Sequence, residues 1–373
     1  MKVYFFLSNL SESDYDYFLD KLQFINSQSD IEAILEKYTH KIWESPKWRT
    51  HRAAFVEALV FLKYILSNKK DKIYDIEWVY KKNFLIFNQD IYEDTQDWWK
   101  VIQDKTLFVT TRDTFKHPFF HYIWLGKVNK NITLIKPNYN KVSHLNDKTY
   151  FIWKIWEKRK QYVWDIVIPF AMNTKIGSIQ RIFNFVKINI GNKCVIKNNF
   201  GVEWKMVRAL DLNTLLDRDI DILSKEYFSW NIYNNYTPYF ISYYEIKSEY
   251  RIYFTYFDKN LKVYSVKNKF NTTKDGSNIF TSGSFYKKDI SITWRCCSNE
   301  EFKKSKYDNI KEVYENIIPK LWLQMWVLEL CENQDGEIRF IEVNPMWGTL
   351  MFPWEDETNI HNYYLDMWQS LLD

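Results

Sequence analysis

Two glutamates and an asparagine near the C-terminus have the residue types and spacing of a magnesium site. Glu342 and Asn344 stand two residues apart in an apolar run that ends at Pro345, so on a β-strand both project from one face. Glu329 lies as far before the turn dipeptide Asp335-Gly336 as Glu342 lies after it, which predicts a hairpin with the two carboxylates facing each other. Such oxygen donors suit Mg²⁺. The alternative is an amphipathic hairpin whose charged residues face solvent.

Two lysines upstream have the chemistry to bind phosphate. Lys148 opens a predicted helix, and Lys197 ends a β-branched strand that leads into the loop containing Gly201. Lysine supplies a point charge that suits a triphosphate, and backbone N–H groups of such a loop can cradle phosphate. Taken singly, each lysine is typical of a surface position, and it is the position of both relative to the acidic hairpin that favours phosphate binding.

Between the lysines and the acidic hairpin, two apolar strands are expected at 238–246 and 249–254. Glu249 and Arg251 are two residues apart on the second strand, so they share a face. The guanidinium group of Arg251 can neutralise phosphate there or hold a carboxylate bidentately. The alternative is an ion pair on an exposed sheet, which contributes under about 1 kcal/mol.

Composition narrows the functional class. The 373 residues suffice for two or three lobes, and 51 Lys and Arg against 47 Asp and Glu indicate no dedicated nucleic-acid binder. The four cysteines include no Cys-x-x-Cys pair, which argues against zinc. No apolar run reaches the length of a membrane span. We therefore expect a soluble cytoplasmic protein with neither nucleic acid nor membrane as partner.

The N-terminal part is expected to be a mixed α/β lobe without a dinucleotide-binding glycine fingerprint. Apolar residues at helical spacing predict a helix over 53–66. Short apolar runs predict strands at 3–7, 84–87, 107–110, 122–125 and 132–135.

The order of these motifs resembles the ATP-grasp superfamily. The shared pattern is an Asp-Lys opening a helix, a second Lys before a glycine loop, a hinge, and Glu-Val-Asn-Pro after an acidic strand. It covers about residues 146–357, although the loop keeps only Gly201 where the family usually has several glycines. The resemblance implies an α+β or α/β fold with an N-terminal α/β lobe, 1–145, and two antiparallel-sheet lobes clasping the nucleotide, 146–230 and 231–373.

The resemblance also implies ATP and Mg²⁺ as cofactors and assigns roles. Lysines contact the ATP phosphates, the backbone of the hinge meets adenine, Glu249 bonds the ribose, and arginines stabilise the transferring phosphoryl group or the acyl-phosphate. The implied ATP-binding residues are Lys148, Lys197 with Lys187 as its rival, Gly201, Tyr243, Tyr244, Glu245 and Glu249. The implied catalytic residues are Arg251 and Arg295, and the implied metal ligands are Glu329, Glu342 and Asn344.

By analogy with the family, the activity is ligation of a carboxylate to an amine through an acyl-phosphate, with a peptide, protein or amino acid among the substrates. The segment after Pro345, ending in Trp354-Glu355-Asp356-Glu357, resembles the eukaryotic branch that helps assemble translation initiation factor two, and related phage and bacterial proteins. An ATP-binding assembly factor or chaperone without ligase chemistry is therefore the alternative. A structural protein with a vestigial site is a third.

Overall fold

The structure is a computed structural model with two compact units. It describes residues 1–7, 58–66, 74–79, 82–96, 98–110, 125–135, 148–163, 165–167, 176–199, 207–228, 238–243, 246–272, 291–296, 308–321, 323–333, 335–344 and 357–372, with single residues between 16 and 33 and at 119, 122 and 123. Unit 1 comprises Met1–Val142, Phe254–Tyr264 and Met346–Asp373; unit 2 comprises Ser143–Tyr253 and Ser265–Pro345. The division into three lobes stays a prediction.

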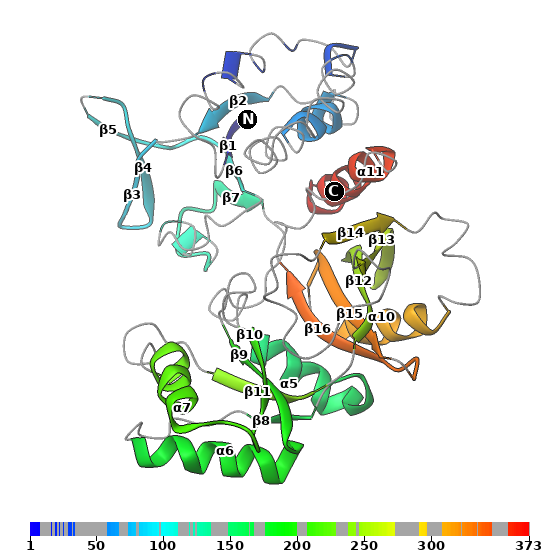
Figure 1. Ribbon diagram of the computed structural model, residues 1–373. Helices are drawn as coiled ribbons and strands as arrows, with labels where there is room; N and C mark the ends of the chain where they lie inside the picture. The colour runs from blue at the N-terminus through cyan, green and yellow to red at the C-terminus, as the bar shows by residue number, and fades with distance from the viewer. Residues whose placement is uncertain are drawn as a thin grey trace. The chain divides into compact units, whose positions relative to one another are not determined.

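Unit 1 contains a parallel sheet in the order β2-β1-β6-β7 (Figure 1). Its strands are β1 (Lys2–Phe6), β2 (Asp75–Val79), β6 (Thr106–Thr110) and β7 (Ile132–Ile135). Parallel sheets are covered on both faces, and Val3, Tyr4 and Phe5 are accordingly all buried in succession. Burial of both faces of the sheet explains why the apolar residues of β1 follow one another rather than alternating with polar ones.

A second, antiparallel sheet in unit 1 consists of β3 (Phe84–Phe87), β4 (Asp90–Asp94) and β5 (Trp99–Val101). The strand predicted at 122–125 is wrong. Tyr122 and Ile123 are helical, and a turn follows in which the Gly126 N–H donates to the Ile123 carbonyl (3.0 Å). A short apolar run fits a buried helical turn as well as a strand, and Ile123 packs into the core.

The C-terminal helix α11 (Glu357–Leu372) belongs to unit 1 and carries its largest fully buried side chain, Trp368. The Trp368 ring lies 5.8 Å from Phe5 of β1 and 5.0 Å from Phe61, centroid to centroid. Phe61 belongs to the helical stretch 58–66, within the helix predicted over 53–66. Aromatic packing thus joins the two ends of the chain in one core.

Unit 2 begins with a small antiparallel sheet in the order β10-β9-β11-β8. Its elements are α5 (Lys148–Arg159), η4 (Lys160–Tyr162), β8 (Ile166–Val167), α6 (Ile176–Ile190), β9 (Lys193–Asn198), β10 (Val207–Asp211), α7 (Asp217–Leu223), η6 (Ser224–Phe228) and β11 (Pro238–Ser242). Cys194 and Ile196 of β9 pack against α6 and α7. Because side chains alternate along a strand, Lys197 projects from the opposite face.

The second sheet has five strands in the order β14-β13-β12-β15-β16. Its elements are β12 (Ile246–Phe257), β13 (Asn260–Thr272), β14 (Ser291–Cys296), α10 (Asp308–Leu321), β15 (Met325–Asn333) and β16 (Ile338–Asn344). Helix α10 packs against α5 and β16. At the β15–β16 turn Gly336 has φ +82°, and the Asn333 side chain accepts the Glu337 N–H at 2.8 Å. The predicted hairpin is confirmed, with glycine where a left-handed backbone is needed.

Replacement of Trp368 tests the aromatic core of unit 1. Trp368→Ala should lower the free energy of unfolding by about 3–5 kcal/mol, because it removes a fully buried ring and leaves a cavity. Trp98→Ala is the matched control, since Trp98 is 80% exposed, and should change it by less than about 0.5 kcal/mol. Urea denaturation followed by circular dichroism measures both, and equal effects would contradict the core assignment.

Candidate functional site

The acidic pair on the β15–β16 hairpin has the predicted register. Glu329 and Glu342 are direct Cα partners across the two antiparallel strands, and the register shifts by a β-bulge immediately after Glu329. Directly opposed residues have Cβ atoms about 4.5–5.5 Å apart, so both carboxylates can reach one ion. Asn344 is the last residue of β16, opposite Val327, and its side chain lies outside the described residues.

Each carboxylate is paired with a cation that the sequence had singled out. Lys148 Nζ lies 2.6 Å from Glu342 Oε2. Arg251 Nε contacts Glu329 Oε1, and the Glu329 side chain is only 8% exposed. Both pairs are partly or largely removed from water, where a charge without a partner is costly. The structure therefore brings together four of the predicted residues from α5, β12, β15 and β16.

A backbone hydrogen bond holds Lys148 beside the end of the strand that carries Lys197. The N–H of Lys148, at the start of α5, donates to the carbonyl of Asn199 at 3.0 Å, and Asn199 directly follows β9. This bond fixes the first turn of α5 beside the end of the strand that carries Lys197. The predicted pair of phosphate-binding lysines thus lies at one place in unit 2.

Lys197 sits within the influence of both members of the Lys148–Glu342 pair. Burial lowers the pKa of its ammonium group, and the positive charge of Lys148 lowers it further, while Glu342 and Glu249 oppose that shift. An anionic ligand would favour the protonated form of Lys197. The position is therefore suited to receive negative charge.

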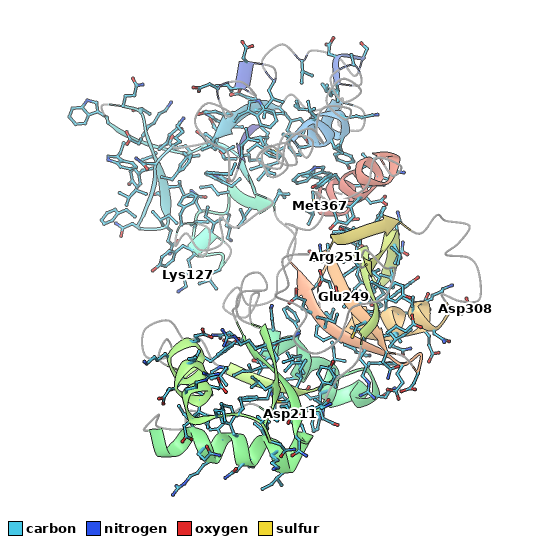
Figure 2. The ribbon with its side chains drawn as sticks, in the orientation of Figure 1. Lys127, Asp211, Glu249, Arg251, Asp308 and Met367 are labelled. Carbon is cyan, nitrogen blue, oxygen red and sulfur yellow. The ribbon has the colours of Figure 1, made fainter. Side chains whose placement is uncertain are left out.

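Glu249 and Arg251 lie on one face of β12, as predicted (Figure 2). Glu249 is 5% exposed, which contradicts the alternative of an ion pair on an exposed sheet. Burial disfavours the charged guanidinium of Arg251, but Glu329, Tyr253 and Glu249 outweigh it and raise the pKa of Arg251. A positive charge is thereby held among the carboxylates of Glu329, Glu249 and Glu342.

Cys331 belongs to the same neighbourhood, and sequence reasoning missed it. Its thiol is fully buried, and burial, followed by the charge of Glu249, raises its pKa well above the ordinary value. Its Sγ lies 3.6 Å from the Arg339 carbonyl as a weak donor. The spacing of two from Glu329 on β15 was the available signal. A buried thiol that stays protonated packs against its neighbours there and does not act as a nucleophile.

Among the remaining predicted residues that the structure describes, Lys187 is not brought into this cluster. Lys187 lies on α6, where its Nζ donates to Asn213 Oδ1 at 2.7 Å on an exposed surface, so the geometry favours Lys197 over its rival. Tyr243 follows β11 and donates its N–H to the Lys193 carbonyl. Arg295 lies in β14 opposite Asn268. The side chain of Arg295 and all of Gly201, Tyr244 and Glu245 lie outside the described residues.

The donor set fits a hard divalent cation in its chemistry. In the part of the chain that the structure describes, no three His, Cys, Asp or Glu side chains form a metal-holding group, but the predicted set needs only two carboxylates and an amide. Mg²⁺ usually takes one or two protein carboxylates and completes its shell with water and phosphate oxygens. Glu329 and Glu342 meet that requirement on opposed strand positions.

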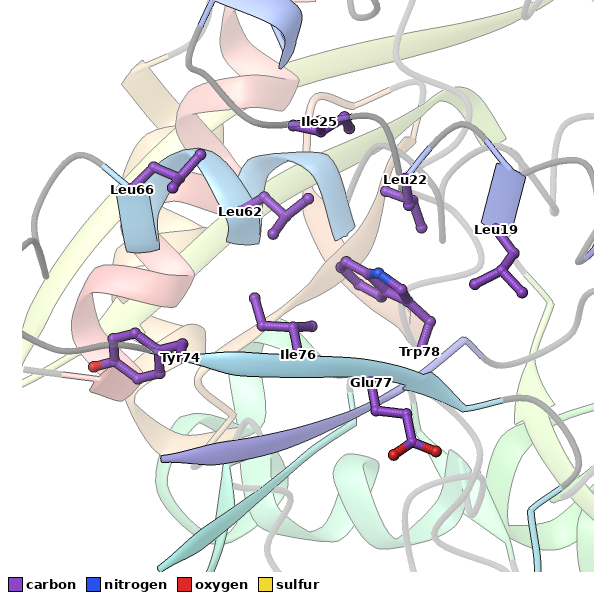
Figure 3. Close-up of a pocket in the computed structure, with 9 residues that line it drawn as sticks. All are labelled: Leu19, Leu22, Ile25, Leu62, Leu66, Tyr74, Ile76, Glu77 and Trp78. Atoms are coloured by element: carbon purple, nitrogen blue, oxygen red, sulfur yellow. The ribbon is translucent and has the colours of Figure 1, made fainter.

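A pocket of about 570 Å³ in unit 1 contains none of these residues. It lies between β2 and apolar side chains that include Leu22 and Leu62, and Figure 3 shows Ile76 and Trp78 on that face with Glu77 on the other. Glu77 pairs instead with Lys2 at 3.0 Å. The predicted site residues that the structure brings together lie in unit 2 instead. None of the described helices has the length and apolar character required to cross a lipid bilayer.

Double-mutant cycles should separate the buried ion pair from an exposed one in the same unit. Arg251→Met should cost about 3–5 kcal/mol because it leaves the Glu329 carboxylate buried and uncompensated, and adding Glu329→Gln should recover much of that loss. The control cycle uses Arg208 and Glu226, which are 2.9 Å apart and 36% and 40% exposed; its coupling should stay below about 1 kcal/mol. Unfolding by urea gives both values, and similar couplings would contradict the burial argument.

Comparison with known proteins identifies the fold. No protein-family model and no curated protein matches the sequence. Among solved structures, D-alanyl-alanine synthetase A from Vibrio cholerae is similar over 100% of this chain and 99% of its own, at TM-score 0.59 and 11% identity. VanG D-Ala:D-Ser ligase from Enterococcus faecalis is similar over 88% and 95%, at 0.57 and 12%. D-Alanine-D-Alanine ligase from Helicobacter pylori is similar over 86% and 95%, at 0.50 and 11%. This chain therefore has the ATP-grasp fold that the order of its motifs predicted.

Proposed function

We propose that this protein is an ATP- and Mg²⁺-dependent ligase that joins a carboxylate to an amine. One observation carries the proposal: three basic and three acidic side chains gather within unit 2 of an ATP-grasp fold. They are Lys148, Lys197 and Arg251, with Glu249, Glu329 and Glu342. A triphosphate with its divalent cation presents negative and positive charge side by side, which complements these basic and acidic side chains.

In this proposal Lys148 and Lys197 bind the phosphate oxygens of ATP. Lys148 opens α5, so the N-terminus of that helix adds a favourable dipole for an anion. Glu249 accepts hydrogen bonds from the ribose hydroxyls, and the backbone of Tyr243, Tyr244 and Glu245 pairs with the adenine edge. Gly201 contributes backbone N–H groups from the loop after β9.

Glu329, Glu342 and Asn344 are proposed to hold Mg²⁺. When bound, the ion would supply positive charge that offsets the negative charge of the phosphates. The role of the protein chain is to position the ligands of the ion. The opposed register of β15 and β16 presents two carboxylates together, and Arg251 keeps Glu329 in place through its ion pair.

The proposed reaction has two steps. An oxygen of the substrate carboxylate attacks the γ-phosphorus of ATP, the bond to the β–γ bridging oxygen breaks, and ADP leaves. The amine nitrogen then attacks the acyl carbon, inorganic phosphate leaves with the C–O bonding electrons, and the nitrogen loses a proton to solvent. Arg251, with Arg295 as a second candidate, offsets the negative charge on the transferring group. Catalysis of this kind relies on orientation and charge neutralisation.

Nucleotide binding is the first test. The wild-type protein should bind Mg-ATP, and ligand at about 100 times its Kd should add about 2.7 kcal/mol of stability. Lys197→Met should weaken binding about 10- to 100-fold, because a charge-assisted contact to phosphate contributes about 1.5–3 kcal/mol. Arg208→Met, which breaks an exposed ion pair outside the cluster, should bind like wild type. Isothermal titration calorimetry measures all three, and a wild type that shows no binding would overturn the proposal.

Trapping of the acyl-phosphate tests the reaction class. With ATP, Mg²⁺, hydroxylamine and a panel of amino acids and peptides, the protein should form ADP and a hydroxamate of one carboxylate. Glu342→Gln should lower that rate at least about 100-fold, which corresponds to about 2.7 kcal/mol of the barrier, while the fold is retained by circular dichroism. Nucleotide binding without any hydroxamate or covalent product would favour the assembly factor instead.

A further inference from the structure

Glu342, a proposed metal ligand, and Lys148, a proposed phosphate-binding residue, form an ion pair with each other in this structure. Lys148 Nζ lies 2.6 Å from Glu342 Oε2, and each side chain is 18% exposed. A lysine in that contact cannot at the same time bind phosphate at full strength, and the carboxylate oxygen that it covers is not open to a cation. The pair therefore has to separate before either residue performs its proposed role.

We propose that Lys148 holds the cation position at Glu342 in the ligand-free protein and moves to the phosphates when nucleotide and divalent cation bind together. The inference rests on the proposed function and deepens it, because it makes the occupancy of the two ligands interdependent. In the ligand-free protein the ammonium group of Lys148 competes with the divalent cation for Glu342, so the cation does not bind there without nucleotide.

The geometry allows Lys148 to exchange partners without unfolding α5. Its backbone N–H is fixed to the Asn199 carbonyl, so the Cα stays in place while the flexible four-carbon stem carries the charge. The neighbouring acidic residue behaves differently. Glu329 is 8% exposed and contacts Arg251 through Oε1, and the exchange at Lys148 leaves that ion pair in place.

Charge makes the exchange favourable only when both ligands are present. A cation alone would expel the Lys148 ammonium towards Lys197, whose pKa Lys148 already lowers. A triphosphate alone would draw Lys148 away and leave the Glu342 carboxylate facing more negative charge. Binding of both gives every charged group a partner, which is the condition for positive coupling between two ligands.

Metal binding to the nucleotide-free protein tests the exchange directly. Mn²⁺ serves as the probe, and the free ion is counted by electron paramagnetic resonance. Lys148→Met should bind Mn²⁺ about 10-fold or more tightly than wild type, in the range typical of coupled sites, because Glu342 loses its competing cation. Lys148→Met with Glu342→Gln should return to weak binding. Arg208→Met is the matched control and should bind Mn²⁺ like wild type.

The outcomes separate this inference from the proposed function. An unchanged or weaker Mn²⁺ affinity in Lys148→Met overturns the exchange, and so does an equal gain in Arg208→Met. Wild-type binding of Mg-ATP under the same conditions would then leave the proposed function standing. Circular dichroism checks that the variants are folded, and Lys148→Gln, which keeps a polar side chain but no charge, must show the same gain.

Discussion

The register between β15 and β16 is the constraint on which the other charged contacts depend. Because Glu329 and Glu342 are direct partners, their carboxylates leave the same face of the sheet and meet cations from two other elements. A slip by one residue would turn Glu342 to the opposite face and separate it from Lys148. Gly336 with φ +82° and the Asn333 side chain on the Glu337 N–H fix the turn. The pairs beside the turn, such as Leu330 with Phe340, would place Glu329 opposite Ile341, and the β-bulge after Glu329 brings Glu342 there instead.

Burial explains why the cluster contains as many basic as acidic side chains. Glu249 and Glu329 are 5% and 6% exposed, and a carboxylate at that depth needs a cation or several hydrogen bonds. Arg251 lies on the face of β12 that it shares with Glu249 and contacts Glu329 on β15. One guanidinium therefore offsets the charge of two acidic residues on different strands.

Local patterns could be predicted from the sequence, and contacts between distant segments could not. The Asp335-Gly336 turn and the equal spacing on either side predicted that Glu329 and Glu342 oppose each other. The structure confirms this, but through a β-bulge after Glu329 that the two-residue period of a strand does not predict. The choice between Lys187 and Lys197 depended on α6 lying beside Asn213, more than twenty residues away. Tyr122 and Ile123 were misassigned because four apolar residues contain too little periodicity to distinguish a helical turn from a strand. Cys331 belongs to no motif, and its spacing of two from Glu329 gains meaning only once its burial near Glu249 and Lys197 is known.

The solved structures that share this fold are about one-ninth identical to the chain, so the fold has been kept by patterning of apolar and turn residues rather than by particular side chains. Function then depends on the few positions where the interior is not apolar. In unit 2 those positions are charged residues, of which Lys148 and Glu342 form one ion pair and Arg251 and Glu329 form another. A neutral small molecule offers nothing to exchange for these ion pairs. A ligand that presents fixed negative charge together with a divalent cation would give Lys148 and Glu342 a new partner each, which is the physical reason for proposing a metal-bound nucleotide.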